Sequence, residues 1–173
     1  MKTILTEHQL DLTIQRLCHQ ILENHLDTAN LALIGLQPRG VYLSNRLARE
    51  LEKQTGGKKL DYGILDITFY RDDIREELHL ANQTRIPFSI ENKKVVLIDD
   101  VLYTGRTIRA ALDALLDYGR PSKVELCALI DRRYSRELPI QPDYVGKSID
   151  SIISQKVRVF WKEKDDREEV VLM

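Results

Sequence analysis

One segment constrains the fold more than any other: residues 95–107, VVLIDDVLYTGRT, in which an apolar run is followed directly by two acids, a glycine turn and a helix-like stretch. A short, fully apolar run such as 95–98 predicts a strand buried on both faces, which is typical of parallel sheets covered by helices. In such sheets, ligands bind beyond the carboxyl ends of the strands. We therefore expect Asp99 and Asp100 to end a strand and to face a ligand.

The rest of the chain alternates strand-like and helix-like segments. Thr6 and Gln9 have capping-box spacing ahead of a helical repeat, and apolar runs at 31–34 and 124–130 predict further buried strands. Alternation through Leu65, Ile67 and Phe69 predicts another strand. Residues 157–161 and 170–172 predict an antiparallel hairpin. The pattern favours an α/β fold with a mainly parallel central sheet flanked by helices and C-terminal antiparallel strands.

Composition excludes several other classes of protein. The chain has 173 residues, 43% of them hydrophobic and 31% charged, which indicates a single globular domain spanning residues 1–173. The net charge of -1 gives no whole-chain attraction for nucleic acid. No apolar run approaches the roughly 18 residues that cross a membrane, and no signal peptide is evident, so we expect a soluble cytoplasmic protein with no membrane partner. Cys18 and Cys127 lie outside any metal-ligand spacing, and we expect both to be buried.

The residues after the two acids favour a phosphate. They lead from the strand into the next helix: Tyr103, Thr104, Gly105, Arg106 and Thr107. Free N–H groups at a helix N-terminus, hydroxyls and a glycine suit a phosphate, whereas the acids suit hydroxyl groups or a hydrated Mg²⁺ on the same ligand. A phosphorylated ribose meets both demands, and the GxxxxGK[ST] and GxGxxG motifs are absent. The alternative is an ordinary strand end and turn, in which these features coincide by chance.

The same segment resembles the phosphoribosyl pyrophosphate (PRPP) signature of type I phosphoribosyltransferases. Three more segments extend the similarity: GLQPRGVYLSNRLA at 35–48, DITFYRDD at 66–73, and IDRRYSRELPIQPDYVGKSI at 130–149. From about residue 6 to residue 159 the chain resembles the PyrR family, pyrimidine operon attenuation regulators with uracil phosphoribosyltransferase activity. This resemblance implies a type I phosphoribosyltransferase-like fold with a small hood at about residues 131–150.

The resemblance also implies roles for the PRPP-binding residues. Asp99 and Asp100 would hold the ribose hydroxyls and, through PRPP or water, Mg²⁺, while the 103–107 loop would hold the 5′-phosphate. Pro38, Arg39 and Gly40 match the pyrophosphate loop, and Arg39 would join the two acids in catalysis as a cation for the leaving group. Type I enzymes commonly have a non-proline cis peptide here. Proline makes that isomer inexpensive, so we expect the Gln37–Pro38 bond to be cis, with an ordinary rigid turn as the alternative.

Two further parts of the site follow from the same resemblance. Residues 71–86 match the flexible loop that closes over PRPP, where Tyr70, Arg71 and Asp72 are the residues expected to act; a solvated arm is the alternative. Asp131 and Arg132 match the hood over the base, which would read the uracil edge through hydrogen bonds. For Arg133 and Arg136, the sequence favours a solvated charge run as much as a functional role.

The implied reaction joins N1 of uracil to C1 of PRPP and releases pyrophosphate, giving uridine monophosphate (UMP). The implied partners are PRPP, uracil, UMP or UTP, pyr operon leader mRNA and other copies of this chain in a homo-oligomer. Arg16, His19 and Lys156 are candidate RNA contacts, although Leu12 and Gln15 stand where the family usually has a basic residue and a threonine. The open alternatives are an enzyme alone, an enzyme that also regulates RNA, a regulator without catalysis, and a transferase for another base.

Overall fold

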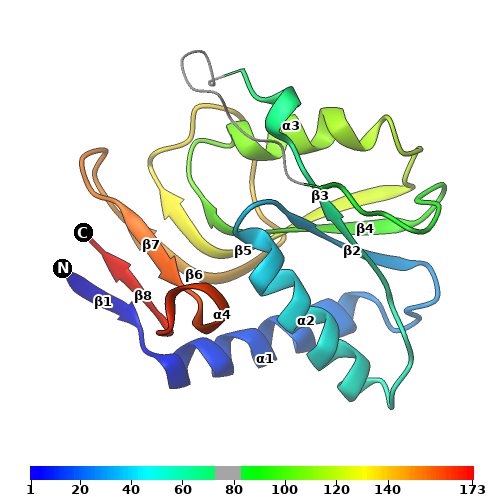
Figure 1. Cartoon of the computed structure of the whole chain (residues 1–173), viewed down its shortest axis with the longest axis horizontal. Coiled ribbons are helices and arrows are strands. Elements are labelled where there is room, and N and C mark those ends of the chain that lie inside the picture. Colours follow the sequence, from blue (N-terminus) through cyan, green and yellow to red (C-terminus); the bar gives the residue numbers. More distant parts are fainter. Residues whose placement is uncertain (73–82) are drawn as a thin grey trace.

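The central sheet of the computed structural model, which describes residues 1–72 and 83–173, is parallel throughout (Figure 1). Its five strands lie in the order β3-β2-β4-β5-β6. They are β2 (Leu31–Leu36), β3 (Asp61–Leu65), β4 (Lys94–Leu102), β5 (Lys123–Arg133) and β6 (Tyr144–Asp150). The expected α/β class and the parallel central sheet are thereby confirmed.

Helices cover both faces of this sheet. On one side lie α1 (Glu7–Asn24) and α2 (Gly40–Gln54), and on the other lies α3 (Arg106–Leu115), as Figure 1 shows. The core is accordingly divided into two clusters, one containing Leu17 and Leu47 and the other containing Ile108. The predicted capping box begins α1, because the Thr6 side chain accepts from the Gln9 N–H and the Gln9 side chain accepts from the Thr6 N–H.

A second, antiparallel sheet of three strands stands at one end of the molecule, in the order β1-β8-β7. Strands β7 (Val157–Phe160) and β8 (Glu169–Leu172) confirm the predicted hairpin, and the one-turn helix α4 (Lys162–Asp165) lies between them. The first strand, β1 (Lys2–Leu5), was not expected from the sequence. It is short and pairs only with β8, at the other end of the chain, so no local pattern marks it.

Two of the strand boundaries that differ from the prediction lie near the two acids or near the expected flexible loop. The strand expected through Leu65, Ile67 and Phe69 ends at Leu65, where its partner β2 also ends. The short 3-10 helix η1 (Thr68–Tyr70) follows, and Phe69 is 84% exposed. Conversely, β4 does not end at Asp99 but continues to Leu102, because β5 keeps pairing with it after β2 has stopped. The acids therefore lie where β4 loses one neighbour and retains the other.

Three further expectations concern smaller features. Cys18 and Cys127 are buried and unpaired, as expected. Residues 73–82, which make up most of the expected flexible loop, lie outside the described residues. In the described part of the chain, no helix combines the length and apolar character needed to cross a membrane.

Candidate active site

Asp99 and Asp100 are almost completely enclosed, at 9% and 8% exposure. The Asp100 N–H donates to Oδ1 of Asp99 over 2.9 Å. Burial raises the pKa of Asp99 well above its usual value, and repulsion from Asp100 raises it further. Burial also raises the pKa of Asp100, although Arg39 opposes the shift. Such a pair is stabilised by a cation or by hydroxyl donors of a ligand.

The segment expected to bind pyrophosphate, residues 38–40, lies at the start of α2 and directly against these acids. The Gln37–Pro38 bond is cis, as predicted, and Arg39 occupies the N-cap position of α2 without a capping hydrogen bond from its side chain. A Cβ on Gly40 would lie 2.5 Å from the Ile98 carbonyl oxygen and 3.0 Å from Cα of Asp99. Since backbone cannot move away as a side chain can, only glycine allows α2 to begin this close to β4.

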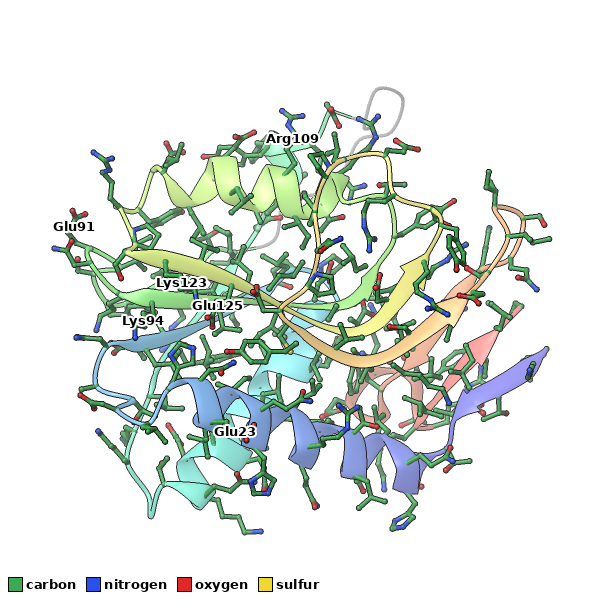
Figure 2. The ribbon with its side chains drawn as sticks, turned by 180° about the vertical axis from the view of Figure 1, so that it is seen from behind. Glu23, Glu91, Lys94, Arg109, Lys123 and Glu125 are labelled. Atoms are coloured by element: carbon green, nitrogen blue, oxygen red, sulfur yellow. The ribbon has the colours of Figure 1, made fainter. Side chains whose placement is uncertain are left out.

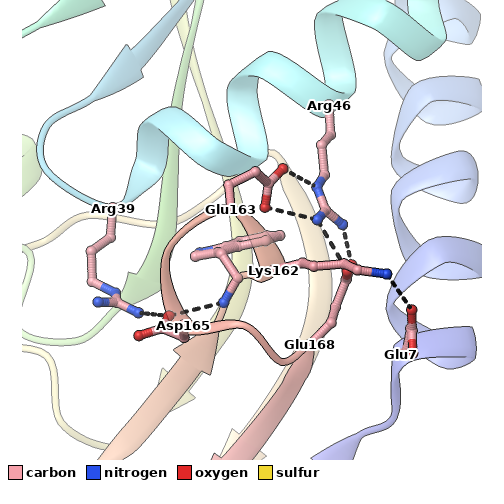
Figure 3. Close-up of polar contacts among 8 residues, drawn as sticks. Glu7, Arg39, Arg46, Lys162, Glu163, Asp165 and Glu168 are labelled. Atoms are coloured by element: carbon pink, nitrogen blue, oxygen red, sulfur yellow. Dashed lines mark hydrogen bonds and ion pairs between the residues drawn. The ribbon is translucent and has the colours of Figure 1, made fainter.

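Arg39 connects this loop to two other parts of the molecule. Its Nε lies 3.6 Å from Oδ2 of Asp100, and its Nη2 donates to Oδ2 of Asp165 over 3.0 Å (Figure 3). The same Nη2 donates to the carbonyl of Val159 in β7. Asp165 is far from Arg39 in sequence and belongs to none of the motifs that predicted the site, so this contact is new.

The expected phosphate loop surrounds a cavity of about 310 Å³. Its lining includes Asp99, Arg71 and the five predicted residues Tyr103, Thr104, Gly105, Arg106 and Thr107. Gly105, the N-cap of α3, has a φ of 95°, a conformation that glycine adopts without strain. The Thr104 hydroxyl accepts from the Arg106 N–H over 3.3 Å. The structure therefore gathers one acid and the whole loop around a single space at the start of α3.

Arg136, in the segment between β5 and β6 that was expected to form a hood, holds this loop. It donates through Nη1 to the Tyr103 carbonyl and through Nη2 to Oδ1 of Asp131, each over 2.6 Å. The N–H groups of Glu137 and Leu138 both donate to the Thr104 carbonyl. The solvated role considered for Arg136 is therefore wrong, whereas Arg133 is exposed and pairs with Asp150. The RELPI segment that carries Arg136 was the available signal for its role.

Arg132 is buried at 5% exposure and supports the loop through Tyr103. Its Nε donates to the Ser151 hydroxyl over 2.8 Å, and its Nη2 donates to the carbonyls of Ile152 and Gln155. The guanidinium carbon lies 3.9 Å from the centroid of the Tyr103 ring, a cation–π contact. Arg132 thus ties the 151–155 segment to the predicted phosphate loop.

The three residues expected to act in the flexible loop lie against α3 or the cavity. Arg71 donates to the Thr107 hydroxyl over 3.4 Å. Asp72 accepts from Arg106 and from Arg109, which Figure 2 labels on α3. The hydrogen bond from Arg109 is the largest cause that lowers the pKa of Asp72. Tyr70 donates its hydroxyl to Asp117, just beyond α3. The base of the loop is therefore anchored, while residues 73–82 are not described.

The three candidate RNA contacts lie in two different parts of the chain. Arg16 and His19 are exposed on α1, and Arg16 donates to the carbonyls of Val145 and Gly146 in β6. Lys156 is exposed next to β7, and its backbone pairs with that of Met173. Two of the three candidates thus lie on one helix, and the third lies just before the first residue of β7.

Comparisons with a family model and with curated relatives identify the same family. The family model described as phosphoribosyl transferase domain matches residues 1–164. A relative from Caldicellulosiruptor bescii named "Bifunctional protein PyrR" is 48% identical over 99% of this chain and 94% of its own. A relative of the same name from Acetivibrio thermocellus is 53% identical over 84% of this chain and 79% of its own.

Solved structures agree on the fold. A hypoxanthine phosphoribosyltransferase from Trypanosoma cruzi superposes with a TM-score of 0.76 and 18% identity, covering 99% of this chain and 95% of its own. One from Staphylococcus aureus gives a TM-score of 0.74 and 22% identity, covering 98% and 90%. At this level of identity, the likeness supports the fold and leaves the choice of base open.

Proposed function

The chain belongs to the PyrR family of phosphoribosyltransferases, and from this premise we propose that it transfers the phosphoribosyl group of PRPP to uracil, giving UMP and pyrophosphate. The observation that carries the proposal is the cavity that places Asp99 beside the 103–107 loop at the start of α3. Anion-binding and hydroxyl-binding groups there stand side by side, as a phosphorylated ribose requires.

Each part of PRPP has a matching group. The backbone N–H groups at the start of α3, with the hydroxyls of Thr104 and Thr107, would bind the 5′-phosphate. Asp99 and Asp100 would accept hydrogen bonds from the ribose hydroxyls, which offsets the burial of their charge. The backbone at 38–40 would hold the pyrophosphate, because Gly40 lets the loop lie directly beside the acids.

The donor set of the site fits Mg²⁺, a hard cation that prefers carboxylate and phosphate oxygens. Asp99 and Asp100 would hold it indirectly, through PRPP or water, since no group of three or more His, Cys, Asp or Glu side chains in the described residues could hold a metal ion alone. When bound, Mg²⁺ would neutralise charge on the departing pyrophosphate.

The reaction breaks the bond between C1 and the pyrophosphate oxygen and forms the bond between C1 and N1 of uracil, whose N1 proton passes to solvent or pyrophosphate. The residues of this chain bind and orient the reactants, which converts the encounter into a positioned displacement. Asp131, held by Arg136, would help to read the base beside Tyr103. The base of the loop at 70–72 would help to exclude water, which competes for the ribosyl cation-like transition state.

We also propose that the chain binds pyr operon leader mRNA and that UMP or UTP modulates this binding. The curated relatives carry the name bifunctional, and Arg16 and His19 stand exposed on α1, where phosphate groups have access to them. Because PRPP, uracil and messenger RNA are cytoplasmic in bacteria, both functions would operate in the cytoplasm.

Product analysis tests the enzymatic proposal. The protein is incubated with PRPP, Mg²⁺ and uracil, and in parallel with hypoxanthine or orotate. We expect UMP and pyrophosphate in equal amounts with uracil and little product with the other bases. Equal turnover of a purine would contradict the choice of base, and no turnover of any base would contradict the reaction itself.

A further inference from the structure

The guanidinium of Arg39 is held by the small sheet as well as by the acids. Asp165, at the end of α4, has a side chain that is 11% exposed and accepts from Nη2 of Arg39 over 3.0 Å. The carbonyl of Val159 accepts from the same nitrogen, while Nε faces Asp100. Besides Asp100 of β4, two residues that belong to neither the expected pyrophosphate loop nor the central sheet therefore hold this side chain.

Asp165 is itself rigidly placed. Its Oδ2 also accepts from the backbone N–H of Trp161 over 3.0 Å, which fixes the carboxylate across α4. The Trp161 side chain is fully buried, its ring stacks on that of Tyr42 in α2, and Arg46 lies over the same ring. The carboxylate of Asp165 is thus hydrogen-bonded to the backbone of a residue whose side chain is fixed in the core.

A second contact clamps α4 and Glu168, the residue just before β8, onto α2. Arg46 donates to both carboxylate oxygens of Glu163, over 3.0 and 2.9 Å, and also to Glu168 (Figure 3). Bidentate arginine–carboxylate pairs of this kind fix geometry as well as add energy. Since α2 begins at the pyrophosphate loop, the clamp holds Asp165 at a fixed position relative to Arg39.

The carboxylate of Asp165 is also suited to a charged role. Burial acts to raise its pKa, but the Trp161 N–H and the charge of Arg39 outweigh burial, so the pKa lies below its usual value. Asp165 is therefore ionised at neutral pH and forms a charge-assisted hydrogen bond with Arg39.

We propose that Asp165 is a positioning residue for PRPP binding: it holds Arg39 in the one orientation that also faces Asp100. Without this contact, the long arginine side chain would sample several rotamers, and PRPP binding would have to restore the productive one. The small sheet then contributes to the affinity of a site that it does not line. This inference rests on the proposed function and deepens it.

The test is Asp165→Asn in the full chain, which removes the charge and retains a side-chain oxygen for the Trp161 N–H. Calorimetric titration with PRPP and Mg²⁺, without uracil, measures the PRPP dissociation constant directly. We expect it to rise about tenfold, the usual effect of losing one charge-assisted hydrogen bond. In turnover assays, KM for PRPP should rise similarly while KM for uracil stays within about twofold of the native value.

The matched control is Glu163→Gln, in the same helix. It weakens the clamp on Arg46 and leaves the Arg39 contact intact, so it should lower the unfolding temperature without changing PRPP affinity. If Asp165 acted only by stabilising the hairpin, both variants would weaken PRPP binding in proportion to their loss of stability, and the proposal would be overturned.

A double-mutant cycle with Arg39→Ala completes the test. If Asp165 acts through Arg39, Asp165→Asn will have no further effect on PRPP affinity once Arg39 is absent. Additive losses, or native affinity in Asp165→Asn alone, would overturn the proposal. A native chain that binds PRPP but makes no UMP would contradict only the uracil reaction, and one that does not bind PRPP would contradict both.

Discussion

Asp99 and Asp100 are carboxyl groups buried where the surrounding protein disfavours their charged form. Burial raises the pKa of both carboxyls, and their mutual repulsion adds to the shift for Asp99. A carboxyl whose pKa is raised by folding destabilises the folded state at neutral pH, since its ionised form is better solvated in the unfolded chain. The free protein thus retains two acids at a cost in stability, and a bound ligand would reduce that cost.

The double variant Asp99→Asn with Asp100→Asn separates the contribution of the acids to activity from their cost in stability. We expect it to abolish UMP formation because the ribose hydroxyls and Mg²⁺ lose their ligands, while the unfolding temperature stays the same or rises because the buried charges are gone. Product assays and thermal unfolding at pH 7 measure the two effects. Near-native turnover in this variant would contradict the assignment of the whole site.

Gly40 is the residue whose substitution should act through shape alone. In Gly40→Ala the new methyl group meets the Ile98 carbonyl and the Asp99 backbone, so α2 must move away from β4. We expect a loss of about 1–3 kcal/mol in the free energy of unfolding, as for other overpacked sites. We also expect kcat/KM for PRPP to fall at least about tenfold.

The control for this variant is Gly56→Ala. Gly56 has a φ of 72° and open space around its missing Cβ, so alanine costs about 1 kcal/mol of backbone strain far from the site. If Gly56→Ala loses about as much stability as Gly40→Ala but keeps the native kcat/KM, the effect of Gly40→Ala on activity is local to the site. Equal activity losses in both variants would show that it is not.

At the scale of single helices and strands, short sequence patterns predicted the features that depend on only a few neighbouring residues. The apolar run of β4 followed by two acids and TGRT indicated the site, because strand burial, helix capping and glycine conformation act over a few residues. The Arg39–Asp165 contact was beyond reach, since it joins elements that meet only through the folding of the whole chain. The predicted extension of the strand to Phe69 was wrong for a related reason. The apolar–polar alternation of the sequence continues beyond Leu65, but the partner strand β2 has already ended there.

The outer face of α1 governs the RNA prediction. Because Arg16 is engaged with two carbonyls of β6, and Leu12 and Gln15 supply no cation, we expect weak RNA binding with little dependence on salt. Each phosphate contact that is absent lowers the slope of log affinity against log salt by about 0.7 to 0.9.

A salt titration of leader-RNA affinity, with and without UMP, measures this slope. Arg16→Ala should reduce it further if the face is correctly placed. UMP can alter the affinity only if two states of the protein bind RNA differently. Tight, UMP-dependent binding that Arg16→Ala leaves unchanged would place the RNA elsewhere on the molecule.

At the scale of the whole molecule, the buried carboxylate of Glu125 is expected to make stability depend on pH. Glu125 in β5 is 4% exposed and accepts from the Tyr144 hydroxyl over 2.8 Å. It also pairs with Lys123 over 2.6 Å and lies 2.7 Å from His25, the residue just after α1. Figure 2 labels Lys123 and Glu125. Burial acts to raise the pKa of Glu125, but these three partners lower it below the usual 4.5. Glu125 and its partners therefore join α1, β5 and β6 through an ionised carboxylate.

Glu125→Gln should reduce the free energy of unfolding at pH 7 by about 2 kcal/mol, because buried donors lose a charged acceptor. Since the pKa of Glu125 is lowered by folding, its contribution is fully present above pH 4.5 and is lost as the pH falls through the folded-state value. The difference between native protein and variant should therefore shrink below pH 4.5.

Denaturant unfolding at several pH values from 7 to 3 measures this difference. The control is Glu23→Gln, at an exposed position on α1 that Figure 2 also labels, which should leave stability unchanged at every pH. A difference between Glu125→Gln and native protein that stays constant down to pH 3 would contradict the assignment.

Assembly stays a prediction at this scale. We expect a homo-oligomer, and exposed apolar side chains such as Tyr134 at 85% and Ile153 at 83% are the kind of surface that another copy would cover. Size-exclusion chromatography with light scattering measures the mass in solution. A monomer at micromolar concentration would contradict the prediction.

The pairing of β1 with β8 has a consequence for the order in which the molecule folds. The central sheet grows through neighbouring strand–helix units, whereas the small sheet joins segments from opposite ends of the chain. Closing so long a loop is entropically costly and slow, so this sheet should assemble late. Asp165 then reaches Arg39 only when most of the chain has already found its place. An intermediate with a complete central sheet would display both acids yet bind its ligand weakly, and affinity for PRPP would report the last stage of maturation.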